Sequence, residues 1–316
     1  MNFRVLPAFV LVTAGVASAA APSWQARGPL SEPSLFGDGI ISTGQFESHP
    51  CFTPDGNTLY FVRSTPQFTD WKIWESHFAD GKWSTPVMAS FSGTHRDADP
   101  FITPDGARLY FISDRPVDGK AREDMDVWFM DRAPDGEWGE PRNMGAPVNS
   151  AGSEWYPRVA AGGTLYFGSD RPGGEGATDL YRVRPTDGGY AAPENLGPSV
   201  NSAADEYEPC IAPDESFLVF MAAGRPDSRG GGDLYISFRE KEGWSAARNL
   251  GPLINRPAME ISASLSPDGQ RFFFSSCRRD TTVKSTPGER PDRSRNGLGD
   301  IYQMDLDALL KLGSGK

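Results

Sequence analysis

The sequence predicts an all-β protein, a five-bladed β-propeller whose ring is closed by an N-terminal strand. Three observations lead to this prediction. A short phrase recurs five times at intervals of 50 to 57 residues. Gly and Pro supply 35 and 27 of the 316 residues, well above the usual share of about 12%, which disfavours long helices. The fifth copy also lacks a strand that the N-terminus can supply.

Each copy begins with a turn of the Pro-Asp-Gly type and continues as a hydrophobic run of the Leu-Tyr-Phe type. Proline presets φ for the turn, and Asp and Gly tolerate its left-handed positions. The turns start at Thr53, Thr103, Ala160, Ala212 and Ser266. The runs start at Leu59, Leu109, Leu165, Leu218 and Phe272. Aromatic and β-branched residues in such runs favour strands.

Two further strands complete each copy. The third starts at Ile73, Val127, Leu180, Leu234 and Ile301. The fourth opens with an aromatic residue, at Trp83, Trp138, Tyr190 and Trp244. A single four-stranded sheet cannot bury both of its faces, but sheets stacked radially around an axis can. A propeller is therefore favoured over a solenoid or a β-sandwich.

The fifth unit ends before a fourth strand, and the segment around Leu35 resembles the missing one. We therefore expect residues 30–42 to form the outer strand of the last blade, which removes the exposed sheet edges. The expected blades span 47–96, 97–153, 154–205, 206–259 and 260–306, so the propeller domain spans 20–306. The remainder, 307–316, is a C-terminal tail, with a short helix expected from Leu306 to Leu312.

The first segment has the features of a secretory signal peptide. Arg4 precedes an apolar run from Val5 to Val16, and Ala17-Ser18-Ala19 is a small-x-small cleavage site. The run is shorter than the roughly 18–25 residues of a membrane-spanning helix. We expect a periplasmic or secreted protein, cleaved near Ala19, with no transmembrane segment.

The cysteines are expected to be unbridged thiols. The Cα atoms of bridged cysteines lie within about 7 Å of each other. Cys51 and Cys210 share one repeat position in non-adjacent blades, so we expect their Cα atoms to lie further apart than this. An odd count, completed by Cys277, leaves at least one thiol without a partner in any case.

The repeated phrases carry a family resemblance. The turn, the Leu-Tyr-Phe run, Ser113-Asp114-Arg115-Pro116 and the later Asp233-Leu234-Tyr235 resemble the WD40-like repeat of TolB-type propellers. Gly243-Trp244 followed by Asn249-Leu250-Gly251-Pro252 is closer to the propellers found beside OmpA-like domains in bacterial cell-envelope proteins. The resemblance covers residues 30–306. It implies a protein-binding scaffold, although some relatives are carbohydrate hydrolases or lyases. Without an OmpA-like domain here, peptidoglycan anchoring is not implied.

Charge and composition narrow the classes of partner. Lys and Arg number 31 against 42 Asp and Glu, for a formal net charge of −11 and a pI near 4.8. A nucleic-acid binder usually presents a basic face, so nucleic acid is not expected as a partner. We expect a monomer that needs no cofactor and binds an envelope protein or glycan.

Acidic and basic residues recur at one predicted mouth of the ring. An acid opens the first strand of every blade, at Glu47, Asp97, Glu154, Glu206 and Glu260, and each except Glu260 is followed three residues later by a proline. An arginine follows the second strand at Arg115, Arg171, Arg225 and Arg278, with Thr65 in its place in blade one. They could line a polar funnel, and free paired carboxylates can cleave glycosidic bonds. A feature repeated in every blade more often serves the repeat, so we favour structural Arg–acid pairs.

A second set of residues breaks the repeat symmetry. His49 has no counterpart in the other blades, and Asp99 and Glu208 occupy its repeat position. The three could form a cluster around the pore, as a base or a metal site, although no metal is predicted. Trp155 and Tyr207, one residue earlier, could stack on sugars. The basic 277–299 loop, with a local charge of +3, is interpreted as a lid, as an anchor for an acidic ligand or as a disordered loop.

Two functions therefore remain open. The favoured one is a non-catalytic scaffold that displays loops around a pore. The alternative is a glycoside hydrolase or lyase that uses two of the repeated acids, together with His49. Pairing of the acids with arginine would disfavour the enzyme, and an open, unpaired acid pair beside aromatic residues would favour it.

Overall fold

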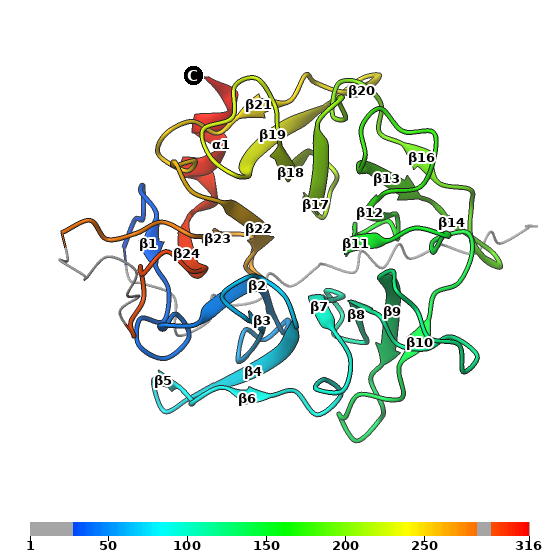
Figure 1. Ribbon diagram of the computed structural model, residues 1–316, viewed down its shortest axis with the longest axis horizontal. Coiled ribbons are helices and arrows are strands. Elements are labelled where there is room, and N and C mark those ends of the chain that lie inside the picture. The colour runs from blue at the N-terminus through cyan, green and yellow to red at the C-terminus, as the bar shows by residue number, and fades with distance from the viewer. Residues whose placement is uncertain (1–27, 283–291, 316) are drawn as a thin grey trace, which may run out of the picture.

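The computed structural model describes residues 28–282 and 292–315 and confirms the five-bladed β-propeller. Five antiparallel sheets surround a central axis, with the first strand of each sheet nearest to it (Figure 1). The predicted signal peptide, Met1 to Ala19, lies outside the described residues. Among the residues described, no helix is long and apolar enough to cross a membrane.

The blades follow one another in chain order. Their inner strands are β2 (Phe46–Phe52), β7 (Asp97–Ile102), β11 (Glu154–Val159), β17 (Asp205–Ile211) and β22 (Glu260–Leu265). The second strands are β3 (Thr58–Ser64), β8 (Arg108–Ser113), β12 (Leu165–Ser169), β18 (Phe217–Ala223) and β23 (Arg271–Ser276). The third strands are β4 (Lys72–Ala79), β9 (Asp126–Asp131), β13 (Asp179–Val183), β19 (Asp233–Glu240) and β24 (Asp300–Asp305).

The fourth strands are short, and the aromatic residues expected to open them belong to separate small hairpins. The sheets end in β6 (Val87–Met88), β10 (Arg142–Asn143), β16 (Glu194–Asn195) and β21 (Arg248–Asn249). The hairpin segments are β5 (Lys82–Trp83), β14 (Pro185–Thr186), β15 (Gly189–Tyr190) and β20 (Gly243–Trp244). In blades one and four, the chain pairs with the third strand for two residues directly after the tight turn, at β5 and β20. It then leaves that strand and pairs with it again further along, at β6 and β21.

The ring closes through β1 (Ser34–Leu35), which is the outer strand of blade five. Ser34 pairs with Gln303 and Leu35 with Tyr302, in antiparallel register. The next residue, Phe36, donates its backbone N–H to the Ile301 carbonyl at 2.8 Å and is buried. The predicted closure is therefore confirmed, and it joins the two ends of the described chain in one sheet.

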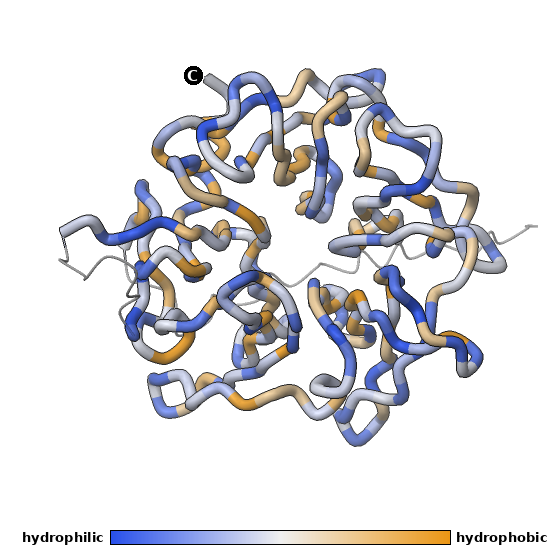
Figure 2. The backbone as a smooth tube through the Cα atoms, viewed as in Figure 1, coloured by the Kyte–Doolittle hydropathy of each residue, from blue (hydrophilic) through white to orange (hydrophobic). Residues whose placement is uncertain are grey.

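The hydrophobic core lies between adjacent blades. Tyr166 and Leu180 of blade three, for example, pack in one buried cluster with Leu218 and Phe220 of blade four. Hydrophobic residues recur along the strands inside each blade (Figure 2). Each sheet thus buries both faces against its neighbours, as the repeat analysis required. The helix α1 (Leu306–Ser314) follows β24, and Leu309 anchors it in the core shared by blades four and five.

The inner strand of every blade contains a bulge at the same place. Pairing with the second strand slips there in all five blades. The residue inside each slip has a left-handed backbone, with φ between 53° and 62°, at His49, Asp99, Tyr156, Glu208 and Ser262. Such φ values are uncommon outside glycine, and bulges re-aim side chains. The five bulges direct one residue per blade toward the axis, where the site lies.

Closure of the ring predicts a large cost for Phe36→Ala. The Phe36 ring packs edge-on against Phe52, Trp83 and Phe273, so its removal opens a cavity between blades one and five. We expect a loss of about 3–5 kcal/mol in the free energy of unfolding, measured by urea denaturation. The control is Ile40→Ala in the same segment, where the side chain is 39% exposed and the expected change is within about 0.5 kcal/mol. Equal, small effects would contradict this account of closure.

Candidate functional site

The five repeated acids are buried inside their own blades. Each is 0% exposed in the structure. Glu206 illustrates the pattern: it accepts hydrogen bonds from the backbone N–H and the hydroxyl of Ser202, at 2.9 and 2.7 Å, and forms an ion pair with Arg225 at 2.8 Å. Arg225 also donates to the carbonyl of Val200 in the loop that leads into the strand. One acid thus joins the incoming loop, the first strand and the end of the second strand.

The same ion pair recurs around the ring. The pairs are Asp97–Arg115 at 3.0 Å, Glu154–Arg171 at 3.0 Å and Glu260–Arg278 at 3.8 Å. The arginines also bond loop carbonyls, as Arg171 does with Val148. Burial is the largest influence on these acids, and it raises the pKa of Asp97, Glu154 and Glu260 despite the bonds. These bonds give the acids and their arginines a structural use inside each blade.

Blade one uses a different arginine. Glu47 pairs with Arg63 at 3.1 Å, whereas Thr65 holds the sequence position of the other four arginines. Arg63 lies directly opposite Glu47 in the β2–β3 ladder, so the side chains meet across the strands. The register between the two strands identifies Arg63 as the partner of Glu47. A comparison of the residues that follow the second strand in each repeat does not, because Arg63 lies within that strand.

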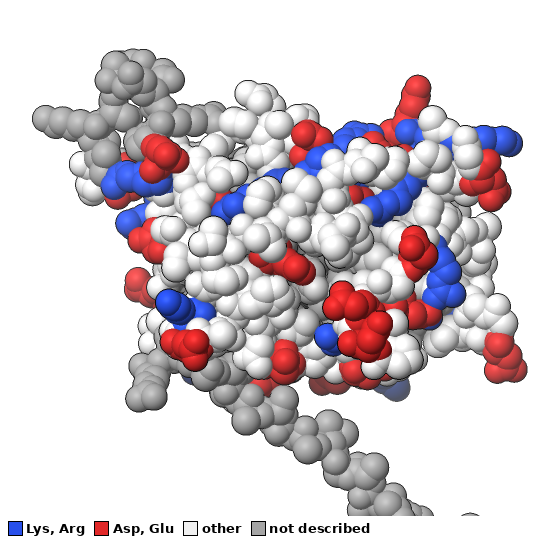
Figure 3. All heavy atoms as spheres, turned by 90° about the horizontal axis from the view of Figure 1, so that it is seen from below, with Lys and Arg blue, Asp and Glu red and all other residues white. Residues whose placement is uncertain are grey.

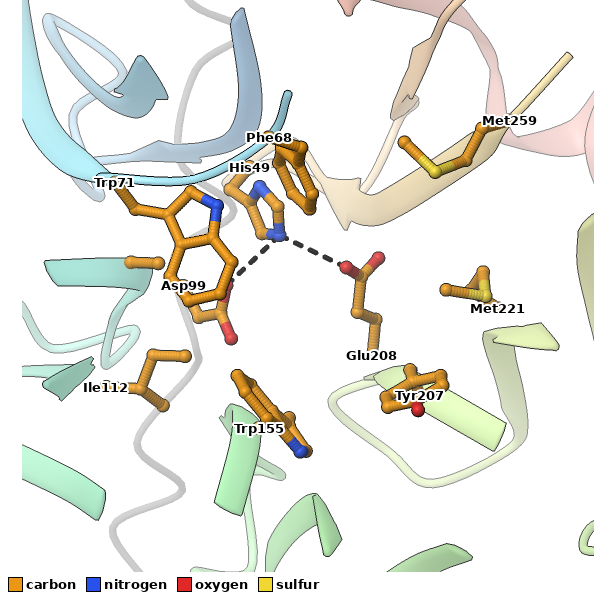
Figure 4. Close-up of a pocket in the computed structure, with 11 residues that line it drawn as sticks. His49, Phe68, Trp71, Asp99, Ile112, Trp155, Tyr207, Glu208, Met221 and Met259 are labelled. Carbon is orange, nitrogen blue, oxygen red and sulfur yellow. Dashed lines mark hydrogen bonds and ion pairs between the residues drawn. The ribbon is translucent and has the colours of Figure 1, made fainter. Parts of the chain in front are cut away.

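The symmetry-breaking residues do come together, on the axis. His49 Nε2 lies 3.0 Å from Asp99 Oδ1 and 3.1 Å from Glu208 Oε1. The imidazole is 3% exposed, and its Nδ1 lies 2.7 Å from the Ser48 hydroxyl. Three blades therefore contribute one side chain each to a single cluster, named here the axial triad of His49, Asp99 and Glu208 (Figure 4).

The remaining oxygens of the axial triad bind the backbone of the other two blades. Asp99 Oδ2 accepts from the N–H of Tyr156 at 2.8 Å, and Glu208 Oε2 accepts from the N–H of Ser262. Both donors are bulge residues of the neighbouring blades. The Tyr156 hydroxyl crosses to the carbonyl of Ala263. The triad thus connects all five blades and uses both oxygens of each carboxylate.

The charges of the triad stabilise one another. Burial, the largest influence, lowers the pKa of His49, but Asp99 and Glu208 more than offset it, so the pKa lies above its ordinary value. Burial raises the pKa of Asp99 to about 6, with the charge of Glu208 adding to the rise and His49 opposing it. The triad thus places one imidazole between two carboxylates.

A pocket of about 330 Å³ opens above the triad. The side chains around it are aromatic, aliphatic or thioether groups: Phe68, Trp71, Ala98, Ile112, Trp155, Tyr207, Met221 and Met259. Figure 4 shows Trp71, Trp155 and Tyr207 around the opening, with Asp99 on the Trp71 side and Glu208 on the Tyr207 side. Aromatic residues with a few polar groups are typical of small-molecule sites. Trp155 and Tyr207 were expected here; Phe68, Trp71 and the methionines were missed, because they lie on loops and strands outside the repeated phrases.

The bulge layer separates this pocket from a second cavity, of about 360 Å³, at the Pro-Asp-Gly end of the channel. Cys51, Cys210 and Arg158 line it. The two thiols form no disulfide, and burial, their largest influence, raises the pKa of Cys51 to about 11 and that of Cys210 to about 12. They are therefore protonated at neutral pH, as expected of inert, buried thiols.

No part of the described chain groups His, Cys, Asp and Glu side chains in a way that could hold a metal ion. The expected loop over the mouth is described only at its two ends. There Asp280 N–H donates to the Arg295 carbonyl at 2.8 Å, and Arg278 belongs to the acid pair of blade five. On the side of the molecule in Figure 3, acidic and basic residues are interspersed.

No family model and no curated protein matches the sequence. Solved structures do resemble the fold. The structure of a BT0996 RGII complex has a TM-score of 0.52 at 10% identity, and the match covers 88% of this protein and 92% of that one. TolB from Acinetobacter baumannii has a TM-score of 0.47 at 17% identity, with 82% of this protein and 54% of that one covered, so the match spans about half of TolB.

A thermostable family-43 glycoside hydrolase has a TM-score of 0.49 at 15% identity, with 76% of this protein and 84% of that one covered. The expected resemblance to TolB-type propellers has no matching sequence family. At identities this low, the similarity supports the fold alone.

The acid pairs predict that Glu206→Gln destabilises the protein. The change leaves Arg225 buried beside a neutral group, and breaking a buried ion pair typically costs about 3–5 kcal/mol. We expect the free energy of unfolding, measured by urea denaturation, to fall by an amount near the lower end of this range, because Gln still accepts a hydrogen bond. Glu240→Gln is the matched control, since Glu240 is exposed on the same blade. A stable Glu206→Gln protein that loses a binding function would show instead that the acid serves a ligand.

The axial triad predicts that His49 titrates above its ordinary pKa of about 6.5. Asp99→Asn removes one of its two anionic neighbours and should lower the His49 pKa, as measured by NMR on labelled histidine. Exposed His77 serves as the internal control. Because the folded-state pKa is the higher one, the stabilisation from His49 is full below about pH 6.5 and declines as pH rises through the folded value. An unshifted His49 pKa in both proteins would contradict the geometry.

Proposed function

We propose that this protein is a non-catalytic binding propeller, whose ligand enters the central pocket above the axial triad. One observation carries the proposal: the pocket has an aromatic and thioether wall, while the polar groups on its floor already bond one another and the backbone. Such a floor positions the blades and sets an electrostatic field. The walls are then left to make the contacts with a ligand.

The walls come from several blades, which suits selective binding. Phe68 and Trp71 lie between β3 and β4 of blade one, Trp155 is on β11 and Tyr207 is on β17. Met221 of β18 completes the side opposite Trp71 (Figure 4). The ring holds these elements at fixed positions, so the residues that each blade contributes determine what fits.

For the partner we propose a protein or a glycan of the cell envelope that inserts one protruding group into the pocket. The features of a signal peptide before Ala19 support a place in the periplasm or outside the cell. The resemblance of the repeats to TolB-type propellers supports an envelope partner. The pocket's volume, at the small end of the roughly 300–1,000 Å³ usual for ligand sites, suits a single group better than a long chain.

One observation favours a second candidate, a glycoside hydrolase. Asp99 and Glu208 each lie within hydrogen-bonding distance of the same His49 nitrogen, so their carboxyl groups are close enough for paired acid chemistry. Asp99, with a pKa raised to about 6, has the property of a general acid. The repeated acids do not support this candidate, because each is paired with an arginine.

A ligand screen with product analysis tests both candidates. The protein is scanned by thermal shift against envelope oligosaccharides and peptides, and each mixture is then examined for cleavage. A binding propeller should give stabilising ligands without products, because a ligand of the native state raises the melting temperature by mass action. Trp155→Ala should abolish the shift, and the control Val87→Ala, exposed on blade one, should retain it.

The opposing outcome is equally specific. Release of a sugar product by the wild type that is lost in Asp99→Asn would establish the hydrolase. Binding that survives Trp155→Ala would place the partner on another surface and overturn the assignment to the central pocket.

A further inference from the structure

We infer that the group that enters the central pocket is an organic cation of the quaternary ammonium type, such as a trimethylammonium head group. This inference rests on the proposed binding function of the same pocket and names its ligand class. Three properties of the pocket lead to it: the sign of the charge at the floor, the aromatic walls and the prior use of the floor's hydrogen-bonding groups.

The ionisable groups that line the pocket are mostly acidic. Asp99 and Glu208 contribute two carboxylates beside one imidazole, and none of the described residues that line the pocket is Lys or Arg. Two guanidinium groups lie outside the pocket lining. Arg96 is 5.8 Å from the ring centre of Trp71, and Arg158, which lines the opposite cavity, is 3.7 Å from that of Tyr156. Arg158 acts on His49 and Asp99 from that cavity, but Asp99 and Glu208 line the pocket and Arg158 does not. A cation in the pocket therefore meets the two carboxylates directly and not Arg158.

The walls add to the same field. The faces of Trp, Tyr and Phe rings carry negative electrostatic potential and attract cations within about 6 Å, and Trp does so most strongly. Trp71, Trp155, Tyr207 and Phe68 surround the opening (Figure 4). The methionines Met221 and Met259 supply polarizable sulfur on the remaining side. Rings on several sides of a small cavity form the kind of cage that recognises methylated ammonium groups.

The hydrogen bonds already present distinguish between cations. Both oxygens of Asp99 and both of Glu208 accept bonds within the protein, and both ring nitrogens of His49 have partners. A sugar or a primary ammonium group loses its hydration on entry and needs new hydrogen-bonding partners, or its burial is costly. A quaternary ammonium has no N–H to satisfy. It gains from the field and the rings without disturbing the triad that joins the blades.

Choline and its neutral analogue test the inference directly. In 3,3-dimethylbutan-1-ol a carbon replaces the choline nitrogen, so the two molecules have the same shape and differ in charge. Titration of the mature protein, followed by calorimetry, should give binding of choline and of tetramethylammonium. The neutral analogue should bind at least about tenfold more weakly, since each cation–π contact contributes a measurable share of affinity. Ammonium chloride should show no binding at the same ionic strength.

Substitution at Met221 locates the binding without touching the triad. Met221→Lys places a positive charge in the wall and should abolish choline binding, whereas the matched Met221→Leu keeps the apolar wall and should bind choline within a few-fold of the wild type. Trp155→Leu should weaken choline by about tenfold or more. Circular dichroism and the melting temperature verify that each variant is folded.

Three results would overturn the inference. Equal affinity for choline and 3,3-dimethylbutan-1-ol would show an apolar pocket that ignores charge. Unchanged choline binding in Met221→Lys would place the cation elsewhere. Absence of binding of any quaternary ammonium to the folded wild type would reject the ligand class. In that last case an envelope oligosaccharide or peptide that still depends on Trp155 would leave the proposed binding function standing.

Discussion

The left-handed bulge in each inner strand is the constraint on which the rest of this structure depends. At this position five non-glycine residues hold an unfavourable φ, and bonds from neighbouring blades offset the cost. Without the bulge, the side chains at these positions would alternate with the pleat and lie within the blade. With it, His49, Asp99 and Glu208 meet on the axis, and one cluster connects all five blades.

Two devices at different radii hold the ring together. Near the axis, the triad bonds each blade to another through side chains and bulge N–H groups. At the outer edge, β1 completes blade five and brings the N-terminal segment beside the C-terminal strand. The acid–arginine pairs act between them, within each blade, and fix the loops that lead into the inner strands. Rigid display of the pocket walls is the consequence.

The pocket shows how structural and functional demands are met at one place. The same carboxylates that join the blades place acidic groups in the floor, and each of their oxygens already has a partner within the protein. Specificity then falls to the surrounding rings and thioethers. In this division the floor joins the blades and the walls contact the ligand.

The spacing of the repeats was sufficient to predict the blades and the closing strand, and it indicated that His49, Asp99 and Glu208 could meet, because equal repeat positions occupy equal places in a ring. The pairing of Arg115, Arg171, Arg225 and Arg278 with the repeated acids followed from the same logic. Arg63 in blade one, and Phe68, Trp71, Met221 and Met259 in the pocket wall, lie outside the repeated phrases. Only the tertiary structure decided their places, because cross-strand register and loop paths depend on packing between distant segments and not on position within a repeat.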